Sequence, residues 1–312
     1  MSIIKRSIHS NDLPNPEKAN IQTWDEPLFK KAGVSVDVLR LDKIHTIVSG
    51  NKWFKLKYYL EEVLLKSKKG VMTLGGPYSN HLLATAFVCS QSGFSSIGIV
   101  RGEEPPAYSN TLKDAQSFGM QLQFVSRQQY LDDVFTERIR QSHPDFLFVE
   151  EGGRGKLGIK GAEEILHLKA LNHYTHVICA VGTGTMMTGI INSSDPAQLI
   201  VGIPVIKLSN NNANSISEFI SNNSKCKNFL LKYDYHFGGY AKRSTELIRF
   251  MNHLHDGQKI PTDFVYTGKL FYAAMNLIES GFFELGSRIL LIHSGGLQGN
   301  RSLPGGTLHF SY

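Results

Sequence analysis

The regular alternation of short apolar runs with amphipathic helical segments is the feature that most constrains this fold. Strands that alternate with helices favour a parallel sheet covered by helices on both faces, so we predict an α/β fold. The predicted strands are 71–74, 95–100, 121–125, 146–149, 176–181, 199–205, 229–231 and 288–293, and the predicted helices are 81–92, 110–118, 130–141, 162–171, 245–255 and 270–280.

The alternating pattern restarts in the middle of the chain. The strand 146–149 ends in Glu150-Glu151-Gly152-Gly153, and a second series of strands and helices follows. A chain of 312 residues is long enough for one large core or two smaller ones. We therefore predict two α/β units with a boundary near 150–158.

Composition and charge narrow the class of protein. Hydrophobic residues make up 41% and charged residues 19%, as in ordinary globular proteins, and the net charge of +6 is spread along the chain. No basic tract is interleaved with aromatic residues, and no apolar stretch has membrane-spanning length. The cysteines Cys89, Cys179 and Cys226 lack the spacing of a zinc site. We expect a cytoplasmic enzyme without a metal, a nucleic-acid partner or a membrane span.

Glycine-rich loops follow several strands, and ligands of open α/β sheets bind at the carboxyl ends of strands. Gly182-Thr183-Gly184-Thr185 lies between a strand and a predicted helix. Free N–H groups at a helix start and the threonine hydroxyls could hold a phosphate. The spacing of a P-loop or of a dinucleotide fingerprint is absent there, and a tight turn that needs glycine is about as good an explanation.

A second loop, Gly75-Gly76-Pro77-Tyr78-Ser79-Asn80-His81, precedes another predicted helix. Ser79 and Asn80 are good helix-capping residues, and the same geometry could bind a carboxylate. A third loop leads through Ser49-Gly50-Asn51 to Lys52 near a helix start. The positive end of the helix dipole would favour the neutral, nucleophilic amine of Lys52. Taken alone, Lys52 is more simply one of several solvated lysines.

The order of the motifs favours a functional role for Lys52. Gly-Asn-Lys-x-x-Lys-Leu, Ser-Asn, the Gly/Thr loop, Tyr-x-Gly-Lys and His-x-Gly-Gly follow one another from about Arg40 to Gly296. This series resembles the family of 1-aminocyclopropane-1-carboxylate (ACC) deaminase and D-cysteine desulfhydrase. Members of that family depend on pyridoxal 5'-phosphate (PLP) and have the tryptophan-synthase-β type of fold.

The resemblance implies a role for each matched residue. Lys52 matches the lysine that binds PLP covalently and later acts as a base, and Asn51 matches a cofactor-holding neighbour. The other implied roles are phosphate binding by Gly182, Thr183, Gly184 and Thr185, contact with the pyridine nitrogen by Ser294, substrate binding by Ser79, Asn80 and His81, proton transfer or covalent chemistry by Ser79, and contact with the substrate face of PLP by Tyr240 and Tyr266.

The resemblance also implies a domain division and an assembly. We expect a larger PLP-binding domain formed by 1–54 and 151–312, and a smaller α/β domain formed by 55–150. We further expect a homodimer.

Particular positions depart from the family pattern. Tyr78 stands where Gln is common, Trp53-Phe54 replaces Thr-Arg, and His81 also differs. Thr267 and Ser294 are closer to the desulfhydrases than to the deaminases. We therefore expect PLP-dependent β-elimination from a small amino acid such as D-cysteine, which gives pyruvate, ammonia and sulfide. Lys52 would remove the α-proton, and the tyrosines would orient substrate, move protons or only pack against the cofactor.

Alternatives remain open at this point. They are ACC deamination to 2-oxobutanoate and ammonia, another dehydratase or racemase of the same fold, and a protein that binds PLP or an amino acid without turnover. The expected reaction class is that of a lyase, a hydrolase or a deaminase.

Overall fold

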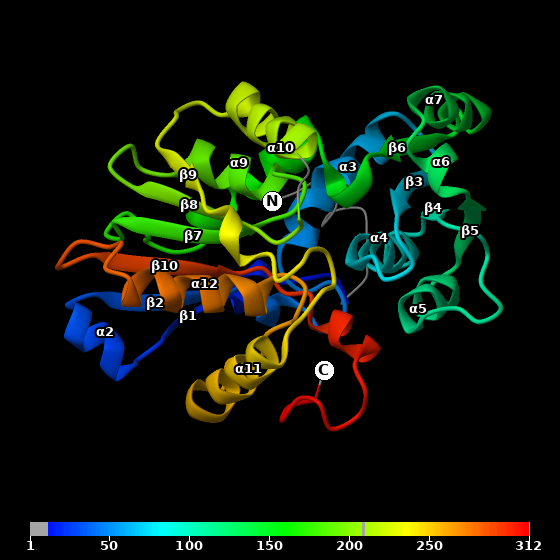
Figure 1. Ribbon diagram of the computed structural model, residues 1–312. Helices are drawn as coiled ribbons and strands as arrows, with labels where there is room; N and C mark the ends of the chain where they lie inside the picture. The colour runs from blue at the N-terminus through cyan, green and yellow to red at the C-terminus, as the bar shows by residue number, and fades with distance from the viewer. Residues whose placement is uncertain (1–11, 208–209, 312) are drawn as a thin grey trace. The chain divides into compact units, whose positions relative to one another are not determined.

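The structure, a computed structural model, describes residues 12–207 and 210–311, and the side chains of 210–214 lie outside this description (Figure 1). The described residues form two compact units. Unit 1 contains 12–14 and Lys52–Gly161, and unit 2 contains Asn15–Asn51 and 162–311. Within the described part of the chain, no helix combines the length and the apolar character needed to cross a membrane.

Unit 2 is built on a six-stranded sheet with the order β1-β2-β10-β7-β8-β9. All neighbouring strands in it are parallel except β1 and β2, which are antiparallel. Central strands such as β7 are buried along nearly their whole length, as expected where helices cover both faces. The strand bounds are β1 Asn20–Thr23, β2 Ser35–Arg40, β7 His176–Val181, β8 Leu199–Pro204, β9 Phe229–Leu231 and β10 Arg288–His293.

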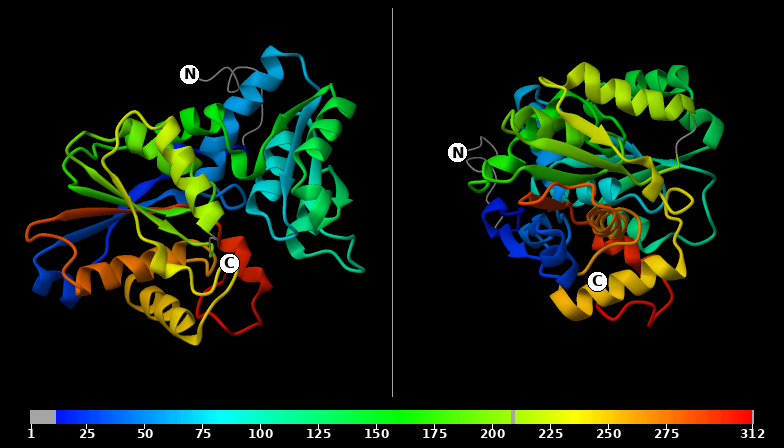
Figure 2. Two further views of the ribbon diagram at one scale, coloured as in Figure 1. Left: turned by 45° about the horizontal axis from the view of Figure 1, so that its top comes forward. Right: turned by 60° about the vertical axis from the view of Figure 1, so that its left-hand side comes forward.

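Helices cover both faces of this sheet. Side chains from α2 and α12 join those of the strands in one large apolar core. Helices α10 and α12 lie on opposite sides of the sheet, as Figure 2 shows. The helix bounds in unit 2 are α2 Pro27–Ala32, α9 Thr185–Ser193, α10 Asn210–Asn223, α11 Thr245–Gln258 and α12 Thr267–Glu279.

Unit 1 contains a four-stranded, wholly parallel sheet with the order β5-β4-β3-β6. One apolar cluster joins it to α4 and α5, and a second joins it to α6 and α7. The bounds are β3 Gly70–Gly75, β4 Ser95–Arg101, β5 Met120–Val125, β6 Phe146–Val149, α4 Asn80–Gln91, α5 Asn110–Ser117, α6 Arg127–Tyr130, α7 Asp133–Ser142 and α8 Lys156–Glu163. Helix α3, Asn51–Leu65, begins at the last residue of the first segment of unit 2 and continues in unit 1.

The predicted α/β class, with two mostly parallel sheets flanked by helices, is confirmed. The division at 54/55 and 150/151 stays a prediction. Two predicted helices are wrong in extent. The segment 130–141 is interrupted because Asp132 caps the start of α7 by accepting a hydrogen bond from Val134 N–H. The segment 162–171 is replaced by α8, which ends at Glu163, and a short 3₁₀ turn.

Candidate active site

The loop after β10 holds the start of α3. Asn51 N–H donates to the carbonyl oxygen of Ser294 at 3.1 Å, and Gly296 N–H donates to Ser49 Oγ at 3.2 Å. A Cβ atom at Gly50, where φ is +73°, would lie 1.8 Å from the Ser294 oxygen, so only glycine allows this approach. Strands β2 and β10 are parallel neighbours, and therefore these loops meet at one edge of the sheet.

The side chain of Asn51 extends to another loop of unit 2. Its Nδ2 donates to Met186 Sδ at 3.2 Å, and Met186 is the second residue of α9. Asn51 thus contacts both the Ser294 loop and the helix that follows the Gly/Thr loop. The next residue in the chain is Lys52, which is half-buried.

The loop Gly182–Thr185 ends at the N-terminus of α9. Gly184, with φ at +85°, is the N-cap and no side chain caps the helix. The hydroxyls of Thr183 and Thr185 lie 3.0 Å apart. A Cβ at Gly184 would approach Ile220 Cγ1 to 3.1 Å, so the backbone here needs glycine. An uncapped helix start with two hydroxyls beside it suits the phosphate group of PLP.

Two predicted tyrosines lie together in unit 2. A Cβ at Gly182 would lie 3.4 Å from Tyr266 Cε1, so the ring of Tyr266 borders the Gly/Thr loop. The ring of Tyr240 meets that of Tyr266 edge to face at a centroid distance of 6.2 Å. Tyr240 as a whole is 42% exposed.

Asp263 holds the backbone of Tyr266 in place. Its buried carboxylate accepts hydrogen bonds from the N–H groups of Val265, Tyr266 and Thr267, at 2.9, 2.7 and 3.0 Å. The hydroxyl of Thr267 also donates to Asp263 Oδ2 at 2.6 Å, and accepts from Asp263 N–H at 2.8 Å. Thr267, the first residue of α12, is therefore bound to Asp263 by both its N–H and its hydroxyl.

A buried ionic group lies next to Ser294. Arg40 binds Asp42 through two nitrogens, at 2.8 and 2.6 Å, and His293 Nδ1 lies 3.3 Å from the same carboxylate. Burial opposes ionisation of Asp42, but the nearby charges of His293 and Arg40 lower its pKa. His293 Nε2 donates to the carbonyl of Pro261 at 2.7 Å, which fixes the ring at the base of the Ser294 loop.

In unit 1, Ser79 is the N-cap of α4. Its Oγ accepts hydrogen bonds from the N–H groups of His81 and Leu82, both at 3.3 Å. The hydroxyl proton is not used by these two bonds, so Ser79 can cap the helix and still donate to a ligand. The neighbouring Asn80 Oδ1 is buried and has no hydrogen-bond partner among the described residues.

The contacts of His81 determine its tautomer. Thr73 Oγ1 donates its only proton to the carbonyl of Val149 at 2.7 Å, and His81 Nε2 lies 3.0 Å from that hydroxyl. Nε2 must therefore carry the proton and donate to Thr73, which leaves Nδ1 as a lone-pair acceptor. Nδ1 is buried without a partner among the described residues. Burial, followed by the charges of Lys52 and Lys55, holds the pKa of His81 far below its usual value, so the ring is neutral.

The predicted residues thus gather in two groups. In unit 2, Asn51, Ser294, the loop Gly182–Thr185, Tyr266 and Tyr240 lie at one edge of the six-stranded sheet. In unit 1, Ser79, Asn80 and His81 lie at the start of α4, and the charge of Lys52 contributes to the lowered pKa of His81. Residues that sequence reasoning missed include Thr73, Asp263 and Lys269. An Asp shortly before a predicted helix is a signal that could have revealed the bonds of Asp263 to the start of α12.

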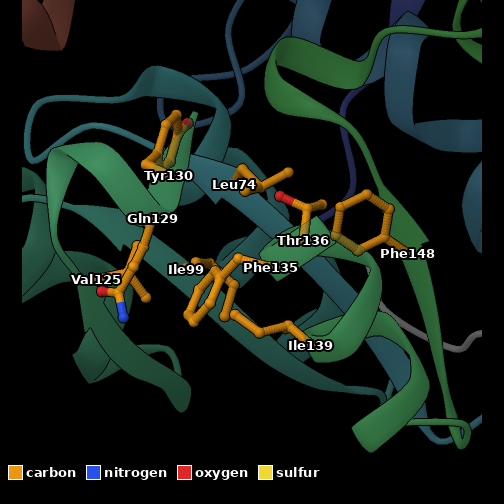
Figure 3. A pocket seen from close by; sticks show the side chains of 9 residues that line it. All are labelled: Leu74, Ile99, Val125, Gln129, Tyr130, Phe135, Thr136, Ile139 and Phe148. Atoms are coloured by element: carbon orange, nitrogen blue, oxygen red, sulfur yellow. The ribbon is translucent and has the colours of Figure 1, made fainter. Parts of the chain in front are cut away.

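A narrow gap between α6, α7 and the sheet of unit 1 is lined by apolar side chains such as Leu74, Phe135 and Phe148 (Figure 3). It is too narrow to hold a water molecule and contains none of the predicted site residues. It is part of the core. Among the described residues, no group of His, Cys, Asp or Glu side chains could hold a metal ion.

Comparison with known proteins defines the class. A family model described as pyridoxal-phosphate dependent enzyme matches residues 26–295. A putative 1-aminocyclopropane-1-carboxylate deaminase of Pyrococcus abyssi (strain GE5 / Orsay) is 27% identical in an alignment that covers 88% of this chain and 90% of that protein. A bifunctional D-cysteine desulfhydrase/1-aminocyclopropane-1-carboxylate deaminase, mitochondrial, of Arabidopsis thaliana is 24% identical in an alignment that covers 92% of this chain and 77% of that protein.

A crystal structure of an ACC deaminase homologue has a TM-score of 0.77 and 25% identity, and the match covers 95% of this chain and 94% of that one. The chain belongs to the family of pyridoxal-phosphate dependent enzymes. Within it, the predicted resemblance to ACC deaminases and the predicted dependence on PLP are confirmed. The reaction class of a deaminase agrees with these relatives, and that of a hydrolase fits poorly.

Proposed function

We propose that the protein deaminates ACC to 2-oxobutanoate and ammonia. The observation that carries the proposal is similarity along nearly the whole chain to proteins named as ACC deaminases. This reverses the order expected from sequence, where D-cysteine desulfhydrase stood first. Thr267 was one reason for that expectation, and its hydroxyl is hydrogen-bonded to Asp263. D-cysteine is kept as a second substrate because one relative is named for both activities.

Each site residue has a proposed task. When bound, PLP supplies an electron-withdrawing ring that stabilises negative charge on the substrate's carbon skeleton. Lys52 would hold the cofactor covalently and carry protons with its amine. The loop Gly182–Thr185 would bind the phosphate, and Asn51 and Ser294 would orient the ring.

Other elements of the chain would bind and orient the substrate. The start of α4, with Ser79 and Asn80, would bind the carboxylate, because a helix N-terminus favours an anion. The unpartnered Nδ1 of His81 would accept a hydrogen bond. Tyr266 and Tyr240 would orient the substrate and hold a proton at their hydroxyl oxygens. In addition, we infer a homodimer from the resemblance alone, which a mass measurement in solution would test.

The test combines a spectrum with a substrate panel. Purified wild type, Lys52→Ala and Lys55→Ala are incubated with PLP, and each is assayed with ACC, D-cysteine and β-chloro-D-alanine for 2-oxo acid. We expect wild type to show the absorbance of lysine-bound PLP and to release 2-oxobutanoate from ACC. Lys52→Ala should lose both, and Lys55→Ala should keep the absorbance. Release of pyruvate from D-cysteine alone would favour the second candidate, and no product from any substrate would contradict both.

A further inference from the structure

Lys269, in the first turn of α12, is fully buried, which is rare for lysine. Its Nζ donates hydrogen bonds to three backbone carbonyls, those of Val205 at 3.0 Å, His236 at 2.9 Å and Gly239 at 2.8 Å. An ammonium group has three protons, and each has one acceptor here. A neutral amine, with two protons, could not donate to all three carbonyls.

The three carbonyls belong to two segments that are far apart in the chain. Gly239 N–H also donates to the carbonyl of His236 and Lys242 N–H to that of Gly239, so the ammonium adds a donor that joins this turn to Val205. Val205 directly follows β8, and His236 and Gly239 form the turn that leads into Tyr240. This turn contains Gly238 with φ at +91° and Gly239 with φ at +129°. Glycines give a turn many accessible conformations, so external contacts must select one of them.

Lys269 also has a fixed relation to Tyr266. The two residues are three positions apart at the start of α12, where Asp263 binds the backbone N–H of Tyr266. The ammonium therefore connects the turn before Tyr240 to the helix start that carries Tyr266. The rings of Tyr240 and Tyr266, which these two segments carry, meet edge to face.

We propose that Lys269 is a positioning residue that sets Tyr240 against Tyr266 on the substrate side of the site. The inference rests on the proposed function, because that function gives the two tyrosines their substrate-facing role. Lys269 itself is fully buried and would act through the three carbonyls that it binds.

The experiment compares Lys269→Met with Lys242→Met. Methionine has a similar length and removes the charge and the donors. Lys242 is exposed and lies in the segment after the same turn, so its substitution removes one positive charge nearby and leaves the three carbonyls bound. Hydrogen exchange of the 233–243 segment is measured by mass spectrometry, together with PLP absorbance, kcat and KM for ACC.

For Lys269→Met we expect exchange in this segment at least about tenfold faster than in wild type, because the turn loses the ammonium that joins its carbonyls to that of Val205. PLP absorbance should be retained, and kcat should fall by about tenfold or more with a smaller change in KM. Lys242→Met should match wild type in all of these. Equal exchange in wild type and Lys269→Met, or an equal kcat, would overturn the inference.

A second variant keeps the inference testable if Lys269→Met does not fold. Lys269→Gln retains an amide donor and should show the same local increase in exchange, to a smaller extent. Exchange at the wild-type rate in Lys269→Gln would overturn the inference. If wild type deaminates neither ACC nor D-cysteine, the proposed function fails. The exchange comparison then still decides whether Lys269 orders the turn before Tyr240.

Discussion

Lys269 places a positive charge in the interior of unit 2, and burying that charge costs free energy. Burial lowers the pKa of Lys269 from its usual value to about 8, and the nearby Asp263 carboxylate opposes this shift. Between pH 8 and the ordinary lysine pKa near 10.5, the unfolded chain therefore binds more protons at this residue than the folded chain does. The contribution of Lys269 to stability must rise with pH in that window.

This gives a prediction for the free energy of unfolding. The free energy of unfolding of wild type, minus that of Lys269→Met, should rise by up to about 3 kcal/mol as the pH rises from 8 to 10.5. Below pH 8 the difference should be constant. Denaturant unfolding of both proteins at several pH values measures it. A difference that does not depend on pH would mean that Lys269 has an ordinary pKa in the folded protein.

Ser79 combines a structural and a proposed chemical role, and two variants separate them. Ser79→Ala should lower the free energy of unfolding by about 1 kcal/mol because α4 loses its cap. If the hydroxyl also transfers a proton, kcat should fall by about a hundredfold or more. Ser79→Thr retains both the cap and the hydroxyl and serves as the control. Loss of stability without loss of kcat in Ser79→Ala would leave Ser79 with the capping role alone.

At the scale of elements, the start of α3 depends on a close backbone approach. Gly50→Ala would place a Cβ 1.8 Å from the Ser294 carbonyl oxygen, so the two loops must separate. Gly281 has nearly the same φ, +72°, and a Cβ placed there would meet no described atom within 4 Å apart from its chain neighbours. Gly281→Ala should cost about 1 to 2 kcal/mol from backbone strain alone.

Gly50→Ala should cost clearly more, about 4 kcal/mol or above, because the clash adds to the same strain. It should also weaken PLP binding, since Asn51 and Lys52 follow directly. Thermal unfolding and a PLP titration of both variants measure these effects. Equal costs in the two variants would contradict the close contact between Gly50 and Ser294.

At the scale of the whole molecule, PLP should stabilise the folded protein. A ligand that binds only the folded state adds about 2.7 kcal/mol when its concentration is a hundred times its dissociation constant. We expect removal of PLP to lower the thermal midpoint, and PLP addition to restore it. Lys52→Ala should show a smaller shift because the phosphate loop still binds. A thermal midpoint that does not change on addition of PLP would contradict a PLP site in the folded chain.

Much of the fold could be predicted because its signals are local. Strands β6, β7, β9 and β10 have the predicted bounds, since an apolar run of strand length between polar turns needs no distant partner to be recognised. Helix α2 and strands β1 and β2 were missed. Their sequences are mixed in polarity, and β2, which pairs with β1, is held in the sheet by β10 from the far end of the chain. The site was predicted only as an ordered set of motifs.

By itself, the sequence determined the alternation of strands and helices, the glycine loops that follow the strands, and the family that their order identifies. The tertiary structure alone decided how those parts act on one another. Asn51 meets Met186 across 135 residues, and Lys269 meets three carbonyls from two distant segments. The tautomer of His81 likewise depends on Thr73 and Val149. Periodicity reports only neighbours along the chain, whereas the protonation and orientation of a buried group depend on neighbours in space.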